Sequence, residues 1–229
     1  MKELDLLKEE IISCQRCPRI SEYIRDVARK KVKRFAKEDY WGKPLPGFGD
    51  PKAELLIVGL APAAHGGNRT GRMFTGDSSG NWLARALYET GFANKPESVN
   101  KDDGLDLKGA YITAVVRCAP PENKPTKEEM ENCNTFLIRE LEILKEVKVI
   151  LCLGSIALKG TLMALKKLYP TAQLRGIKFG HNFVYKPEGL PYTLMTSYHP
   201  SKQNTQTGRL KWEDWVGVFK RVRLELGGG

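Results

Sequence analysis

Four short apolar segments that alternate with helix-forming segments constrain the fold of this chain more than any other feature. The predicted strands are rich in apolar and β-branched residues and cover residues 54–59, 110–116, 147–153 and 192–197. The predicted helices that follow them cover residues 81–90, 127–144, 156–168 and 212–226. Alternating strands and helices form parallel sheets covered on both faces. We therefore expect an α/β fold, a three-layer α/β/α sandwich with a central, mainly parallel four-stranded sheet.

The first part of the chain is predicted to add two helices and a turn-rich linker to this sheet. The helices are expected over residues 2–13 and 21–38, and the linker over residues 40–51. The second helix contains a basic segment, residues 29–34, which is either a solvated helical face or a contact for DNA phosphates. Farther along the chain, Thr126 and Glu129 form a capping-box pattern at the start of a helix.

The length and charge of the chain limit the class of protein. With 229 residues it is long enough for one domain whose core needs no disulfides, and we expect a single domain over residues 1–229. Its 37 Lys and Arg exceed its 27 Asp and Glu by ten, which favours an anionic partner, nucleic acid before an acidic membrane. A basic surface without a function is the alternative. Because no apolar run is long enough for a membrane span or a signal peptide, we expect a cytoplasmic, nucleoid-associated protein without a membrane partner.

Five cysteines in a chain expected inside the cell favour metal binding over disulfides. Cys152 lies within a predicted strand and is expected to be a small core residue. The other four can hold a tetrahedral zinc ion or a 4Fe–4S cluster, and they are Cys14, Cys17, Cys118 and Cys133. Only one pair is closely spaced, which favours iron–sulfur over zinc. Either site would join the N-terminal segment to the body of the fold.

Residues 59–77, which follow the first predicted strand, form a glycine-rich loop with several chemically active side chains. Five glycines allow the backbone to lie close to a ligand, and His65, two arginines, Phe74 and Asp77 share the loop. This mixture suits a polyanion that carries a flat ring. Asp77 either caps the next helix or orients a water molecule for attack on a sugar carbon. Phe74 either closes the loop as a core residue or stacks on the ring that is removed.

His199 and Ser201 follow the last predicted strand and form a second group of candidates. Ligands of parallel α/β sheets bind beyond the carboxyl ends of the strands, so the site is expected among residues 61–77, 117–125 and 198–207. A neutral His199 ring can donate a hydrogen bond to a base that leaves with negative charge, and Ser201 can bind a phosphate. A purely structural histidine is the alternative.

Together these motifs resemble the uracil-DNA glycosylase superfamily, and within it the iron–sulfur branch called family 5, or type b. The resemblance extends over nearly the whole chain. It is carried by the Cys14/Cys17 pair, residues 59–66 (GLAPAAHG), residues 68–77 (NRTGRMFTGD), residues 116–125 (VRCAPPENKP), Cys133 and residues 199–201 (HPS).

The resemblance implies a DNA repair glycosylase that hydrolyses the N-glycosidic bond of uracil in DNA and leaves an abasic site. It implies a structural 4Fe–4S cluster on the four cysteines outside the strands, and a nucleotide flipped out of the duplex. Asp77 would orient the water and His199 would stabilise the departing base. The residues expected to bind the substrate are Gly59, Leu60, Ala61, Ala64, His65, Phe74, Asn123 and Ser201. No lysine is needed as a Schiff-base nucleophile, so a monofunctional hydrolase is expected.

Two departures from related branches affect the expected substrates. Ala63 and Ala64 stand where related branches carry Asp, Asn or Glu, which leaves Asp77 as the best carboxylate for the water. Ala114 stands where the sister branch has an asparagine that reads the edge of uracil. Loss of that amide predicts a broader range, with uracil first and other deaminated bases such as hypoxanthine next, and Asn123 is a replacement contact.

The expected partner is DNA containing uracil or other deaminated bases, and a sliding clamp as an additional partner is left open. Two rival functions are kept. One is a non-catalytic iron–sulfur module that binds DNA on the same fold. The other is a hydrolase of nucleotides or other small molecules, against which stand the high positive charge and the lack of a P-loop motif.

Overall fold

The computed structural model describes residues 2–227, which are built around a sheet of six strands. The four predicted strands form its centre and run parallel: β2 (Leu55–Gly59), β3 (Ala110–Ala114), β4 (Val149–Leu153) and β6 (Thr193–Ser197). They neighbour one another in the order β3-β2-β4-β6. The predicted α/β class and the mainly parallel sheet are therefore confirmed.

Two edge strands extend the expected four-stranded sheet. β1 (Phe48–Gly49) pairs with β3, and β5 (Phe183–Tyr185) pairs with β6, both antiparallel. None of their residues is buried. The sequence prediction missed them because such short edge segments lack the apolar run that marks a central strand.

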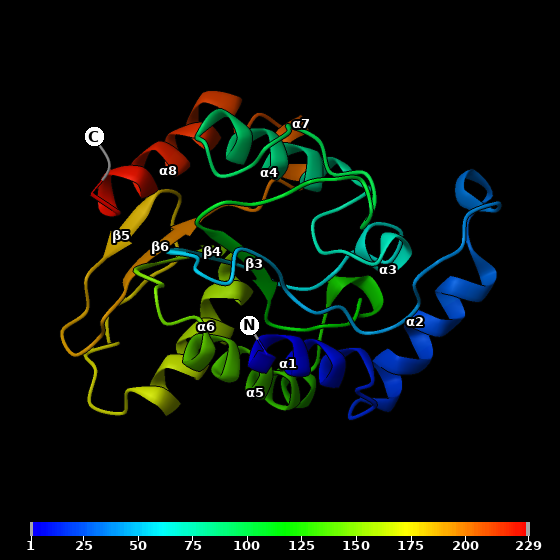
Figure 1. Ribbon diagram of the computed structural model, residues 1–229, viewed down its shortest axis with the longest axis horizontal. Helices are drawn as coiled ribbons and strands as arrows, with labels where there is room; N and C mark the ends of the chain where they lie inside the picture. Colours follow the sequence, from blue (N-terminus) through cyan, green and yellow to red (C-terminus); the bar gives the residue numbers. More distant parts are fainter. Residues whose placement is uncertain (1, 228–229) are drawn as a thin grey trace.

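Helices cover both faces of the sheet and complete three layers (Figure 1). On one face lie α4 (Ser78–Glu89) and α8 (Trp212–Glu225). On the other face lie α1 (Lys2–Ile12), α5 (Lys127–Ile143) and α6 (Ser155–Leu168). Alternate residues of each central strand enter opposite cores. In β2, Leu56 and Val58 pack on the α5 and α6 side, whereas Leu55 and Ile57 pack on the α4 and α8 side.

Local sequence signals explain where the helices begin. Thr126 accepts a hydrogen bond from the backbone N–H of Glu129, whose carboxylate accepts one from the N–H of Thr126, so the predicted capping box is present.

Two short helices, α3 (Gly67–Thr70) and α7 (Lys202–Gln206), were not expected. No helix within residues 2–227 combines the length and apolar composition that crossing a bilayer requires.

The second predicted helix is shorter than expected. α2 spans Pro18–Lys30, and the chain continues into a single 3₁₀ turn, Lys33–Phe35, rather than a helix to residue 38. Pro18 suits the first turn of a helix because it has no N–H to satisfy. Lys31 ends the helix with a left-handed φ of 52°, and its N–H donates to the carbonyl of Val27 at 2.9 Å.

A buried ion pair joins the end of β3 to α5. Arg117 and Glu140 are each 1% exposed, and the guanidinium donates two hydrogen bonds of 3.0 and 2.6 Å to the carboxylate. Thr113 donates a further hydrogen bond of 2.7 Å to the same carboxylate. Arg117 directly precedes Cys118, so the ion pair lies beside this thiol.

Replacing Glu140 with Gln is expected to lower the free energy of unfolding by about 3–5 kcal/mol, because it leaves the Arg117 cation buried without a counter-charge. Urea unfolding followed by circular dichroism measures this loss. Glu142→Gln is the matched control, since Glu142 is exposed on the same helix, and it is expected to change stability by less than about 0.5 kcal/mol. Equal unfolding midpoints for the two variants would contradict a stabilising role for the pair.

Candidate active site

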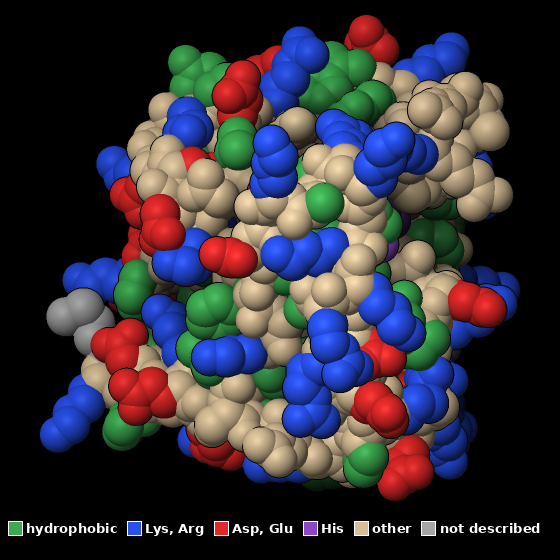
Figure 2. Space-filling view, turned by 90° about the vertical axis from the view of Figure 1, so that its right-hand side faces the viewer, with side chains coloured by type: hydrophobic (Ala, Val, Ile, Leu, Met, Phe, Trp, Pro, Cys, Tyr) green, Lys and Arg blue, Asp and Glu red, His purple; other side chains and the backbone are tan. Residues whose placement is uncertain are grey.

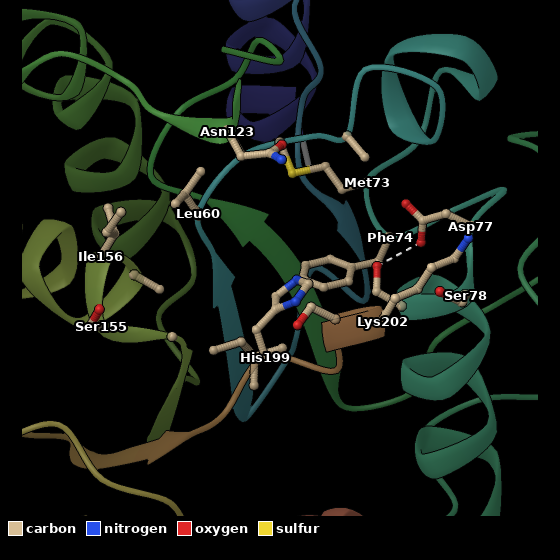
Figure 3. A pocket seen from close by; sticks show the side chains of 17 residues that line it. Leu60, Met73, Phe74, Asp77, Ser78, Asn123, Ser155, Ile156, His199 and Lys202 are labelled. Atoms are coloured by element: carbon tan, nitrogen blue, oxygen red, sulfur yellow. Dashed lines mark hydrogen bonds between the residues drawn. The ribbon is translucent and has the colours of Figure 1, made fainter. Parts of the chain in front are cut away.

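A cavity of about 540 Å³ opens at the carboxyl edge of the parallel strands (Figure 3). It is lined by the loop after β2, by the turn around Asn123 and by residues that follow β4 and β6. The side chains that bear most on its chemistry are those of Phe74, Asp77, Asn123, Ser155, His199 and Lys202. The carboxyl ends of the strands therefore hold the cavity that the topology predicts.

Phe74 and His199 place their rings side by side in this cavity, with ring centroids 5.5 Å apart and planes inclined by 33° (Figure 3). Phe74 has a left-handed φ of 48°, which is uncommon for an aromatic residue. Two glycines make room for it. A Cβ at Gly59 would lie 2.7 Å from the Phe74 ring, and one at Gly80 would lie 2.2 Å from its carbonyl oxygen. The ring position thus depends on backbone that approaches it closely.

Asp77 caps the next helix, which is one of the two roles that the sequence left open, and its carboxylate also faces the cavity. Its Oδ1 accepts hydrogen bonds from the N–H of Gly80 at 2.9 Å and from the hydroxyl of Ser79 at 2.6 Å, so it caps α4. Its Oδ2 has no hydrogen-bond partner among residues 2–227 and lies against Gly66, where a Cβ would be 2.3 Å away. The same carboxylate lines the cavity. One oxygen therefore stabilises the helix while the other is available to a ligand or a water molecule.

His199 is held by its backbone, and its burial favours the neutral form of the ring. Its carbonyl accepts hydrogen bonds of 2.8 Å from the Asn204 side chain and from the N–H of Ser201. Burial lowers the pKa of His199, and the Asp77 carboxylate acts in the opposite direction. A neutral imidazole carries one N–H donor and one acceptor. The ring is therefore equipped to donate a hydrogen bond to an atom that gains negative charge.

The start of α6 is a part of the site that the sequence prediction missed. Gly154 has a left-handed φ of 100° and precedes Ser155, and both line the cavity together with Ile156. No side chain caps this helix, so its first N–H groups present the positive end of the helix dipole. An anion is favoured there. The signal was available, because the rule on carboxyl ends applies to the third predicted strand as well as to the other three.

The structure brings most of the predicted site residues together. Leu60, Ala61, Phe74, Asp77, Asn123, His199 and Ser201 line the cavity, and Gly59 lies beneath the Phe74 ring. Ala64 and His65 do not line it. Ala64 packs against the hydrophobic core on the α5 side, and Nδ1 of His65 lies 3.0 Å from the hydroxyl of Tyr40. Ala63, which stands where related branches carry Asp, Asn or Glu, also lines the cavity, as does Met73, an apolar residue that carried no distinctive signal.

Four thiols gather away from the cavity, where the N-terminal segment meets α5. Cys14 and Cys17 are half-buried, and Cys118 and Cys133 are buried. Burial raises the pKa of Cys133 to about 11 and also raises that of Cys118, and Cys14 and Cys17 act in the same direction on both. The four thiols are therefore close enough to influence one another's charge. Within residues 2–227, however, no three Cys, His, Asp or Glu side chains stand close enough to share one metal ion.

The fifth cysteine stands apart from this group. Cys152 is fully buried within β4, and its thiol donates a hydrogen bond of 3.4 Å to the Thr161 hydroxyl. The predicted core role of Cys152 is confirmed.

Known proteins provide the remaining observations. The sequence model of the uracil DNA glycosylase superfamily matches residues 46–221. The chain is 43% identical over 217 residues to a type-5 uracil-DNA glycosylase of Pyrobaculum aerophilum, covering 95% of this chain and 91% of that protein. It is 45% identical over 222 residues to a type-5 uracil-DNA glycosylase of Thermus thermophilus, covering 96% of each. A type-4 uracil-DNA glycosylase of Sulfurisphaera tokodaii is 28% identical over 227 residues, covering 97% of this chain and 84% of that protein.

Replacing Gly66 with Ala is expected to destabilise the protein by about 1–3 kcal/mol, because the added Cβ displaces the Asp77 carboxylate that caps α4. Thermal unfolding measures the loss. Gly217→Ala is the matched control, since a Cβ at Gly217 in α8 meets no atom within 4 Å, and it is expected to leave stability unchanged or to raise it. If both variants melt at the temperature of the parent, the close packing of Asp77 on this loop is wrong.

Proposed function

The chain belongs to the uracil DNA glycosylase superfamily, and we propose that it removes uracil from DNA by hydrolysing the N-glycosidic bond, which leaves an abasic site. The observation that carries the proposal is the meeting of Asp77, Phe74 and His199 in one cavity at the carboxyl edge of the sheet. Each of these side chains has a part in the reaction that its surroundings support.

The aromatic and imidazole rings act on the base. A flipped uracil stacks on Phe74, whose ring is fixed from below by Gly59. As the N-glycosidic bond lengthens, negative charge develops on the base, and the neutral His199 ring donates a hydrogen bond to it. The positive end of α6 lies on the same cavity and favours the same charge.

The carboxylate acts on the sugar. Asp77 is the only Asp or Glu among the cavity-lining residues in the described part of the chain. Its Oδ2 accepts a hydrogen bond from a water molecule and orients it toward the anomeric carbon, which gains positive charge as the base leaves. Ala63 lines the cavity without a polar side chain, so it does not compete with Asp77 for the water.

The remaining polar groups of the rim suit the phosphates of the flipped nucleotide. Ser201 caps α7 by accepting a hydrogen bond from the Asn204 N–H, and the Lys202 side chain also lines the cavity. A cation at this position attracts phosphate oxygens. The proposed enzyme is monofunctional, since hydrolysis by water needs no Schiff base, and strand cleavage is not expected.

The proposed substrate range extends beyond uracil to deaminated bases such as hypoxanthine. Ala114 is buried at the end of β3, in register with Gly59, and offers no amide to read the edge of a base. Asn123 lines the cavity and is the side-chain amide available for that purpose, held on a backbone with a left-handed φ of 58°. A sliding clamp as partner stays a prediction.

The four thiols Cys14, Cys17, Cys118 and Cys133 are proposed to hold a 4Fe–4S cluster. The donor set fits in its chemistry, because it consists of four free thiols, and Asn132 Nδ2 lies 3.7 Å from the sulfur of Cys17 as an outer hydrogen-bond donor. These four thiolates would hold the cluster. When bound, the cluster supplies Fe–S bonds that join the N-terminal segment to α5, and the hydrolysis needs no electron from it.

Asp77→Asn and His199→Ala are expected to slow uracil release from a labelled oligonucleotide by roughly 10²- to 10⁴-fold, because each removes a group that acts only as the bond breaks. Binding of undamaged DNA is expected to stay within a few-fold of the parent. Asn is a good N-cap residue, so the first variant keeps α4 stable. Asp106→Asn, an exposed carboxylate away from the cavity, is the matched control. Parental rates for both cavity variants would falsify the assigned roles.

Protein purified without oxygen is expected to contain about four irons per chain and to be brown. Cys17→Ser is expected to lower the iron content and the melting temperature together, because the N-terminal segment loses its anchor. Cys152→Ala is the matched control and is expected to keep the iron, since this thiol stands apart from the other four. Colourless parent protein without iron would contradict the proposed cluster.

A further inference from the structure

The end of α2 and the turn that follows it carry a dense positive charge outside the cavity. Six of the nine residues from Arg29 to Lys37 are Lys or Arg, and none is Asp or Glu. We call residues 29–37 the basic projection. All of its cations except Lys31 are exposed. Figure 1 shows α2 and this segment on the side of the molecule beyond α3.

Half of these cations have no counter-charge among residues 2–227. Arg29 and Lys30 pair with Asp26, and Lys31 lies 3.8 Å from Asp39. Lys33, Arg34 and Lys37 form no ion pair with any Asp or Glu in the described part of the chain. Exposed cations without partners raise the local potential and favour an anionic ligand.

The projection is fixed to the loop of residues 59–77, which lines the cavity and is called the cavity loop here. Arg69, 9% exposed, lies over the Phe35 ring at 3.9 Å from its centroid and pairs with Glu38. The same guanidinium donates hydrogen bonds of 2.8 Å to the carbonyls of His65 and Gly76, one residue before Asp77. These contacts hold the 3₁₀ turn of the projection against residues 65–76 of the cavity loop.

A second contact supports this arrangement. The Tyr40 hydroxyl lies 3.0 Å from Nδ1 of His65, and the N–H of Trp41 donates to the carbonyl of Arg69 at 3.0 Å. His65, which does not line the cavity, therefore anchors the segment that follows the projection. Figure 2 shows Lys and Arg side chains spread over the side of the molecule that α2 occupies, with fewer acidic side chains among them.

We propose that the basic projection binds the phosphate backbone of duplex DNA that flanks the nucleotide held in the cavity. The inference rests on the proposed function in taking DNA as the ligand. Phosphate contacts fix the position of a protein on a duplex without reading its sequence. Because Arg69 joins the projection to the cavity loop, this grip would also hold the duplex in register with Phe74 and Asp77.

The salt dependence of DNA binding tests the inference. The variant Lys33→Gln/Arg34→Gln/Lys37→Gln is compared with the parent on an undamaged duplex by fluorescence anisotropy at several salt concentrations. The slope of log K against log salt is expected to become shallower by about 2.7, because each of three phosphate contacts contributes about 0.9. Between roughly 50 and 200 mM salt, the variant should lose roughly fortyfold less affinity than the parent does.

Two further variants separate position and charge from other effects. The variant Lys108→Gln/Lys145→Gln/Lys167→Gln removes the same charge at the amino ends of the parallel strands, away from the cavity. Lys108 precedes β3, Lys145 precedes β4, and Lys167 lies at the end of α6. This variant is expected to keep the parental slope. Lys33→Arg/Arg34→Lys/Lys37→Arg keeps the charge and is also expected to keep it. A slope lowered equally by both Gln triples would overturn the inference, as would an unchanged slope in the projection variant.

Uracil release distinguishes this inference from the proposed function. At saturating duplex the projection variant is expected to release uracil at the parental rate, with a raised KM. If parent and variant release uracil with the same KM and bind DNA with the same salt slope, only the inference about the projection is overturned. Absence of uracil release by the parent would overturn the proposed function, while the salt slopes would still report whether the projection binds DNA.

Discussion

The parallel alignment of four buried strands is the constraint on which the rest of the molecule depends. Because β2, β3, β4 and β6 run in the same direction, their carboxyl ends meet at one edge, where Gly59 is paired with Ala114 and Leu153 with Ser197. Both faces of these strands are covered, so they provide a rigid base for the loops that follow them. The cavity is a consequence of this alignment, since its residues come from distant parts of the chain.

Within that frame, the geometry of the cavity depends on close approach of backbone to side chain. Gly59 and Gly80 leave room for Phe74, and Gly66 leaves room for Asp77. Asp77 also illustrates how stability and chemistry share one group, because one carboxylate oxygen caps α4 and the other faces the loop and the cavity. A substitution there affects both properties unless it preserves the cap.

Buried arginines join the N-terminal segment and the loops to this frame. Arg117 pairs with Glu140 next to Cys118, one of the four clustered cysteines. Arg69 connects the cavity loop to the basic projection. A guanidinium suits such junctions because its planar fork donates several hydrogen bonds in fixed directions. The two proposed anchors of the N-terminal segment therefore lie at opposite ends of α2, since Cys14 and Cys17 precede this helix and the basic projection begins in its last turn.

The sequence by itself determined the central strands and most of the candidate site. Apolar runs located the four central strands, the capping pattern at Thr126 located the start of α5, and the side chains after β2 and β6 identified Phe74, Asp77 and His199. These signals lie in residues that are neighbours along the chain. Only the tertiary structure decided that His65 faces Tyr40 rather than the cavity, and that the basic residues end α2 in a projection. Those outcomes depend on contacts between residues far apart in sequence, which packing determines and local periodicity does not encode.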